Sequence, residues 1–218
     1  MATPGAAPIE ALEEVRTSEA RLLTTITPLD DDAMARPSLL PGWTVGHLLT
    51  HLARNADSHV RRTQAAIDGV MADQYPGGLE GRAAEIESGA GRSATVVRDD
   101  VGSASARLLE AWSDVPGSAW ANITRDASGR ERRLDELPGR RWLEVEVHLV
   151  DLGTGPTPQD WTDAFVAAWL PELRAGASGR LDPGTPLPPP GSLEPRHELA
   201  WLFGRTARDD LPVLGPWQ

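Results

Sequence analysis

The sequence contains no cysteine and no lysine among its 218 residues. The absence of cysteine excludes disulfide bonds, a cysteine nucleophile, thiolate zinc sites and iron–sulfur clusters. Any metal must therefore be held by histidine and carboxylate, and any reactive thiol must come from another molecule. Because lysine is absent, all 21 basic residues are arginine. With abundant alanine, glycine and proline, this usage is typical of GC-rich genomes such as those of actinobacteria.

The chain also lacks a long apolar run and an excess of positive charge. No segment approaches the roughly 18 uninterrupted apolar residues of a membrane helix, and the N-terminus has neither a basic start nor an apolar signal core. Acidic residues number 32, which gives a net charge of −11. This charge argues against a nucleic-acid or anionic-membrane partner, although local arginines can bind a small acidic ligand. We expect a soluble cytoplasmic protein.

Apolar residues recur at helical spacing in several long segments. The length of the chain suits one large domain, or a domain of about 150 residues with a smaller appendix. We therefore predict a mainly α protein, with a four-helix bundle in residues 1–155 and a small α/β or irregular domain in residues 156–218. Residues 79–91 are small, polar and rich in glycine, and read as a loop containing a short helix. The periodicity predicts bundle helices over residues 9–27, 44–68, 93–113 and 138–152, and two more in "DWTDAFVAAWLPELRA" and "RHELAWLFGR".

The predicted helix over residues 138–152 is apolar around most of its circumference, which indicates a buried helix. Glu144, His148 and Asp151 fall into the one remaining arc. Residues four apart on a helix hold their Cβ atoms about 5–6 Å apart, so Glu144 and His148 can bind one ion. Asp151 can then orient His148 or serve a substrate. Glu146 lies on the apolar arc, and we expect it at an exposed edge.

A third ligand is expected from the helix over residues 44–68, because two side chains rarely hold Zn²⁺ alone, whereas three plus an open position describe a catalytic site. This helix carries His47, His51 and His59. His47 points away from the apolar stripe and is expected to be solvated. His59 falls within the stripe and His51 lies about 60° from its edge. Helical geometry therefore leaves His51 and His59 as equal candidates.

Four separate blocks carry a resemblance to a known family. They are "GWTVGHLLTHLARNAD", "YPGGLEGRAAEIESGAGRSA", "RRWLEVEVHLVDLGTG" and "WLFGRTARDDLPVLGPWQ". In this order and spacing the chain resembles the mycothiol-dependent maleylpyruvate isomerases, a metal-binding branch of the DinB-like bundles. Related mycothiol-dependent transferases share the first and third blocks. The resemblance implies a metal held by His51, Glu144 and His148, and so favours His51 over His59.

The resemblance also implies what the site does. Arg82 and Arg205 would face the substrate. From its position on the helix of Glu144 and His148, Asp151 is expected as a further catalytic residue. The implied reaction is cis–trans isomerisation of maleylpyruvate to fumarylpyruvate in gentisate-type aromatic degradation, with a divalent metal, expected to be Zn²⁺, and with mycothiol as the thiol. One alternative is a mycothiol S-transferase acting on another electrophile, and another is a non-catalytic metal-binding bundle. Either a monomer or a homodimer is compatible with the sequence.

Overall fold

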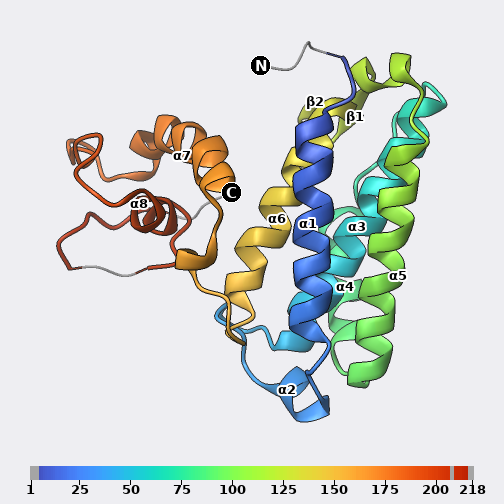
Figure 1. The fold of residues 1–218 in the computed structure, drawn as a ribbon, viewed down its shortest axis with the longest axis horizontal. Helices are drawn as coiled ribbons and strands as arrows, with labels where there is room; N and C mark the ends of the chain where they lie inside the picture. The colour runs from blue at the N-terminus through green and yellow to red at the C-terminus, as the bar shows by residue number, and fades with distance from the viewer. Residues whose placement is uncertain (1–4, 207–208, 216–218) are drawn as a thin grey trace. The chain divides into compact units, whose positions relative to one another are not determined.

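The computed structural model describes residues 5–206 and 209–215, and it is mainly helical (Figure 1). The mainly α fold predicted from the sequence is confirmed. Two compact units divide the chain, one formed by Met1–His148 and the other by Leu149–Gln218. The boundary between the units falls inside a helix. The division into domains of residues 1–155 and 156–218 stays a prediction.

The first unit is built on four long helices that run side by side (Figure 1). These are α1 (Ile9–Ile26), α3 (Val45–Ile67), α5 (Ala94–Ser113) and α6 (Leu137–Asp151), the last of which continues into the second unit. Their bounds lie within two residues of the predicted ones. Each helix turns an apolar stripe inward, as helical periodicity requires. The fully or nearly fully buried residues of this core include Val15, Leu22, Leu48, Leu49, Leu52, Val97, Val101, Leu108, Val145 and Val147.

The start of α3 is fixed by Thr44, as the sequence predicts. The Thr44 hydroxyl oxygen accepts a hydrogen bond from the backbone N–H of His47, and Nδ1 of His47 accepts one from the backbone N–H of Thr44. This reciprocal pair satisfies two backbone donors that the helix leaves free. Nε2 of His47 lies 3.2 Å from Glu87. The expectation of a solvated His47 therefore holds only in part, because the ring caps α3 and its side chain is 17% exposed.

Two shorter helices of the first unit differ from the sequence-based expectation. The helix α2 (Asp31–Ala35), which begins at the capping side chain of Asp30, was not predicted, and α4 (Gly78–Ala90) has 13 helical residues where we expected a loop containing only a short helix. Glycine here serves close packing instead of loop formation. A Cβ on Gly89 would lie 2.5 Å from the Thr50 side chain, and one on Gly46 would lie 2.3 Å from a backbone oxygen of α4. The missing side chains let α4 lie directly on α3.

A small antiparallel hairpin, which the sequence did not predict, lies between α5 and α6. Its strands are β1 (Ile123–Arg125) and β2 (Glu131–Arg133), with Thr124 paired to Arg132. The buried Thr124 hydroxyl accepts a hydrogen bond from Arg62 on α3, at 2.9 Å. Strands of three residues are too short to show a reliable alternation. Short 3₁₀ helices flank the hairpin at Gly117–Ala121 and Leu134–Glu136.

The second unit contains α7 (Asp163–Ala177) and α8 (Pro195–Leu202), both predicted, together with 3₁₀ turns at Pro158–Asp160 and Ser178–Arg180. No strand occurs in its described residues, so irregular segments join the helices. Its core includes a cluster of Trp161, Phe165 and Phe203, with ring centroids 5.4–6.4 Å apart. Such separations are typical of favourable aromatic pairs.

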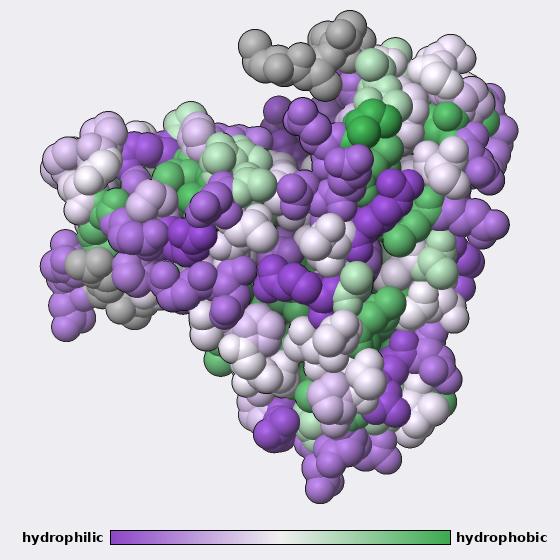
Figure 2. Space-filling view, in the orientation of Figure 1, coloured by the Kyte–Doolittle hydropathy of each residue, from purple (hydrophilic) through white to green (hydrophobic). Residues whose placement is uncertain are grey.

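Apolar side chains are mostly turned into the two cores. On the face shown in Figure 2, hydrophilic residues are widespread and hydrophobic ones form small separate areas. Within the described ranges, none of the helices combines the length and the apolar character that crossing a membrane would require.

Candidate functional site

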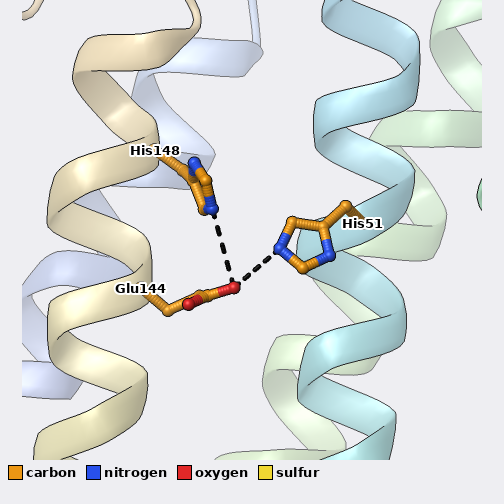
Figure 3. A group of neighbouring side chains, drawn as sticks. All are labelled: His51, Glu144 and His148. Carbon is orange, nitrogen blue, oxygen red and sulfur yellow. Dashed lines mark hydrogen bonds and ion pairs between the residues drawn. The ribbon is translucent and has the colours of Figure 1, made fainter. Parts of the chain in front are cut away.

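Three side chains of the first unit converge between α3 and α6. His51 comes from α3, and Glu144 and His148 come from successive turns of α6 (Figure 3). Nε2 of His51 lies 2.6 Å from Oε1 of Glu144, and Nε2 of His148 lies 3.6 Å from the same oxygen. All three potential ligand atoms lie within 4.8 Å of one another. The i, i+4 spacing on α6 places Glu144 and His148 on one face, and α3 brings His51 opposite them.

The surroundings set the charge of this cluster. Burial lowers the pKa of His51 to about 4, and the hydrogen bond and charge of Glu144 offset this only in part. Burial also raises the pKa of Glu144, but hydrogen bonds from His148 and His51 outweigh it and hold that pKa well below its usual range. At neutral pH the cluster therefore presents a neutral His51 imidazole and an ionised carboxylate, the forms that coordinate metals.

The donor set fits a divalent metal ion. Two imidazole nitrogens and one carboxylate oxygen form one of the protein ligand sets of catalytic zinc, where a fourth position stays open. His59, the rival candidate on α3, does not join this cluster. It lies two turns further along the helix, buried edge-on against Trp112 at 5.7 Å between ring centroids, and its Nδ1 has no hydrogen-bond partner among the described residues.

Arg82 extends the cluster on one side. This residue of α4 donates a hydrogen bond from Nη2 to Nδ1 of His51, at 3.1 Å. Its guanidinium carbon lies 5.8 Å from the ring centroid of Trp43 and 5.6 Å from that of Tyr75. Both distances are typical of cation–π contacts, which arginine makes readily because its guanidinium is planar. The structure therefore brings the predicted Arg82 next to His51, one of the three potential ligands.

Asp151 and Arg205 are paired with each other in the second unit. Arg205 donates from Nε and Nη2 to the two carboxylate oxygens of Asp151, at 2.9 and 2.7 Å. Asp151 is buried and lies three residues after His148 on α6. A planar guanidinium matches a carboxylate in this two-point geometry, which is stronger than a single contact. The catalytic roles of both residues stay predictions.

Glu146 corrects one expectation from the sequence. We expected it at an exposed edge, but the residue is only 2% exposed. Its carboxylate accepts hydrogen bonds from Ser18 at 2.6 Å and from Arg21 at 2.9 Å, both on α1. A carboxylate can be buried when it is paired and hydrogen-bonded. The sequence of α6 by itself does not show that α1 supplies these partners.

The sequence interpretation missed a buried arginine near the site. Arg141 is fully buried and pairs with Glu19 of α1 at 2.6 Å. It also donates to Asn55 of α3, which in turn contacts Glu144. A signal was available, because Arg141 precedes Glu144 by three residues on a helix predicted to be buried nearly all round. A buried arginine requires partners, and those partners lie beside the predicted ligand.

Comparisons with known proteins point to one family. A family model described as the mycothiol maleylpyruvate isomerase N-terminal domain matches residues 15–153. The fold matches a crystal structure of the mycothiol-dependent maleylpyruvate isomerase with a TM-score of 0.86 and 23% identity, covering 99% of this chain and 100% of that one. A histidine-to-alanine mutant of that isomerase matches with a TM-score of 0.87, the same identity and the same coverage. No curated protein sequence matches significantly.

Proposed function

Because the chain belongs to the mycothiol maleylpyruvate isomerase N-terminal domain family, we propose that it converts maleylpyruvate to fumarylpyruvate by cis–trans isomerisation with mycothiol as the thiol. The observation that carries this proposal is the cluster of His51, Glu144 and His148 within the matched segment. The position of Arg82 against His51 supports it, because an acidic substrate needs a cation close to the reacting centre.

In this proposal His51, Glu144 and His148 hold a divalent metal, with Zn²⁺ as the expected ion. Such an ion lowers the pKa of a coordinating thiol, so that the sulfur is a thiolate at neutral pH. The chain contributes by keeping the ligands ready for binding. The burial that lowers the pKa of His51 keeps its imidazole neutral, and Glu144 stays ionised, so binding requires no net loss of a proton at pH 7.

The isomerisation requires a single bond about which the substrate can rotate. Reversible addition of the mycothiol sulfur to one carbon of the conjugated double bond supplies that single bond, and loss of the same sulfur restores the double bond in its trans form. No atom is gained or lost overall, and no oxidant or reductant is needed. The chain itself contains no cysteine that could replace the external thiol.

Arginine side chains would hold the substrate. While sulfur is attached, negative charge develops on the conjugated carbonyl oxygen, and a fixed cation stabilises that charge in a site with little water. The guanidinium of Arg82 lies over the rings of Trp43 and Tyr75, and these contacts would restrict it for this role. Arg205 is the second arginine that we propose for substrate binding. Its hydrogen bonds to Asp151 would orient its side chain for this role.

The test is an assay of purified, metal-loaded protein with maleylpyruvate, in the presence and absence of mycothiol. We expect conversion to fumarylpyruvate, followed by absorbance and identified by chromatography, only when mycothiol is present. Mycothiol should not be consumed. Undiminished turnover without any thiol would contradict the mechanism, and accumulation of a stable thioether would indicate an S-transferase. Metal binding without thiol affinity would favour the non-catalytic alternative.

A further inference from the structure

A chain of buried polar side chains leads from α1 to the carboxylate of Glu144. Its members are Glu19 on α1, Arg141 on α6 and Asn55 on α3, which we call the Glu19–Arg141–Asn55 chain. Each is at most 5% exposed. None belongs to the potential ligand set, and the proposed reaction makes no use of them. Their contacts therefore need an explanation of their own.

Arg141 is the centre of this chain. Its Nε donates to Oε1 of Glu19 at 2.6 Å, and its Nη1 donates to the Leu52 carbonyl at 2.8 Å and to Oδ1 of Asn55 at 2.9 Å. The second oxygen of Glu19 accepts from the Ser105 hydroxyl at 2.6 Å. The guanidinium of Arg141, itself on α6, is thus tied directly to α1 and α3, and through Glu19 to Ser105 of α5.

The hydrogen bond from Arg141 decides how the amide of Asn55 is oriented. Because Arg141 can only donate, the atom of Asn55 that faces it must be the carbonyl oxygen. The amide nitrogen Nδ2 then faces the other way and donates to Oε1 of Glu144, in a long hydrogen bond of 3.4 Å. This is the same oxygen that faces His51 and His148. A carboxylate oxygen has two lone pairs, so one can accept from Asn55 while the other stays directed at the cluster.

Stability alone gives a poor reason for this arrangement. Removing an ion pair such as Arg141–Glu19 from water is expensive, and well-packed apolar residues of similar volume often stabilise a core equally well or better. An oriented donor at a metal ligand has a different effect. Groups that hydrogen-bond to metal ligands fix the orientation of those ligands, and their loss typically weakens metal binding by about 10- to 100-fold.

We infer that Asn55, oriented by Arg141, is a positioning residue that holds the Glu144 carboxylate in its metal-binding orientation. The inference rests on the proposed function, since it takes Glu144 to be a metal ligand. It assigns to the Glu19–Arg141–Asn55 chain the task of linking the ligand to three helices of the bundle, so that the carboxylate is oriented before an ion arrives.

The experiment compares Asn55→Leu, which has a similar volume and no polar group, with the control Thr63→Val. Thr63 is also buried on α3, and its hydroxyl accepts a hydrogen bond from Trp112 at 3.0 Å, remote from Glu144. Zn²⁺ affinity is measured by competition with a chromophoric chelator, coordination by the visible absorption of the Co²⁺-loaded protein, and stability by denaturant unfolding of the metal-free protein. We expect Asn55→Leu to bind Zn²⁺ about 10- to 100-fold more weakly, with an altered Co²⁺ spectrum.

Thr63→Val should lose stability while keeping the wild-type affinity and spectrum. Unchanged affinity and spectrum in Asn55→Leu would overturn the inference, as would an equal loss of affinity in Thr63→Val. If Asn55→Leu does not fold, the same measurements on Asn55→Ser test the inference. Failure of the wild-type chain to bind Zn²⁺ or Co²⁺ would overturn the proposed metal site itself, and the inference with it.

Discussion

Arg82 donates a hydrogen bond to Nδ1 of His51, whose Nε2 lies 2.6 Å from Glu144. One imidazole thus joins the cation from α4 to the potential metal ligand from α6. When one nitrogen of a neutral imidazole binds a metal, the other nitrogen carries the ring proton. Arg82 cannot donate to a protonated Nδ1, so metal bound at Nε2 would free its guanidinium for another acceptor, such as a substrate carboxylate.

Replacing Arg82 by lysine should lower kcat/KM by about 10- to 100-fold, corresponding to the loss of a charge-assisted hydrogen bond of roughly 1.5–3 kcal/mol. Lysine keeps the charge but loses the planar fork and its stacking on Trp43 and Tyr75. Steady-state kinetics with mycothiol present measure the effect. Arg107→Lys is the matched control, because that arginine pairs with Asp57 and is half exposed. Equal kinetics for both variants would remove Arg82 from the proposed site.

Alanine at His51, Glu144 or His148 should each weaken metal binding by at least about 100-fold, since loss of a direct ligand exceeds the loss caused by a supporting group. Elemental analysis after dialysis, together with chelator competition, measures this for each variant. His59→Ala should keep one ion per chain, because His59 packs against Trp112 outside the cluster. A variant set in which His59→Ala loses the ion and His51→Ala keeps it would show that the ligand set is wrong.

Removal of the metal should lower stability without unfolding the protein. The bundle core contains fully buried residues such as Leu22, Leu52 and Leu108, which pack independently of an ion. An ion that binds only the folded state adds about 2.7 kcal/mol at a hundredfold excess over Kd. Circular dichroism at room temperature should keep its helical signal after chelation, while the thermal midpoint falls. Loss of helical signal on chelation would instead mean that the metal creates the fold.

Arg205→Lys should destabilise the second unit by about 1–3 kcal/mol and reduce turnover. The fork of Arg205 contacts both oxygens of the buried Asp151, and a lysine leaves one of them without its partner. Denaturant unfolding and kinetics are measured together, with Arg196→Lys as the control, because Arg196 pairs with the exposed Asp163. If Arg205 acts by holding Asp151, combining Arg205→Lys with Asp151→Asn should add little further loss. Additive losses would mean that the two residues act separately.

Acidification should destabilise the metal-free protein partly through His59. Burial, together with the charges of Arg62 and Arg141, holds the pKa of His59 well below 6.5. Below pH 6.5 the unfolded chain therefore binds a proton that the folded chain does not, and the free energy of unfolding falls as the pH is lowered. Between pH 7.5 and 5.5 this contributes a loss of about 1.4 kcal/mol.

The variant His59→Leu tests this contribution. Denaturant unfolding at both pH values, with a chelator present, should show a pH-dependent loss that is smaller in His59→Leu than in the wild type by that amount. His51 also has a lowered pKa, but it is present in both proteins and cancels in the comparison. Identical pH dependence in the two proteins would mean that His59 takes up a proton equally well in the folded state.

The amino-acid sequence by itself determined the main helices and the face that each one buries. Apolar spacing alone predicted α1, α3, α5 and α6 to within two residues, and Thr44 marked the start of α3. The same spacing singled out Glu144 and His148 as a polar pair on a buried helix. These features follow from a period of 3.6 residues, which acts within one helix and needs no knowledge of its neighbours.

Only the tertiary structure decided which side chains of different helices meet. The helical wheel left His51 and His59 as equals, and only the resemblance to a family favoured His51; in the structure the axial position of α3 against α6 brings His51, not His59, to Glu144. Glu146 is buried because α1 supplies Ser18 and Arg21. Helical periodicity gives the direction in which a side chain points around the axis of its helix. It does not give the position along that axis at which a neighbouring helix packs. That position depends on the packing between helices, which no single segment encodes.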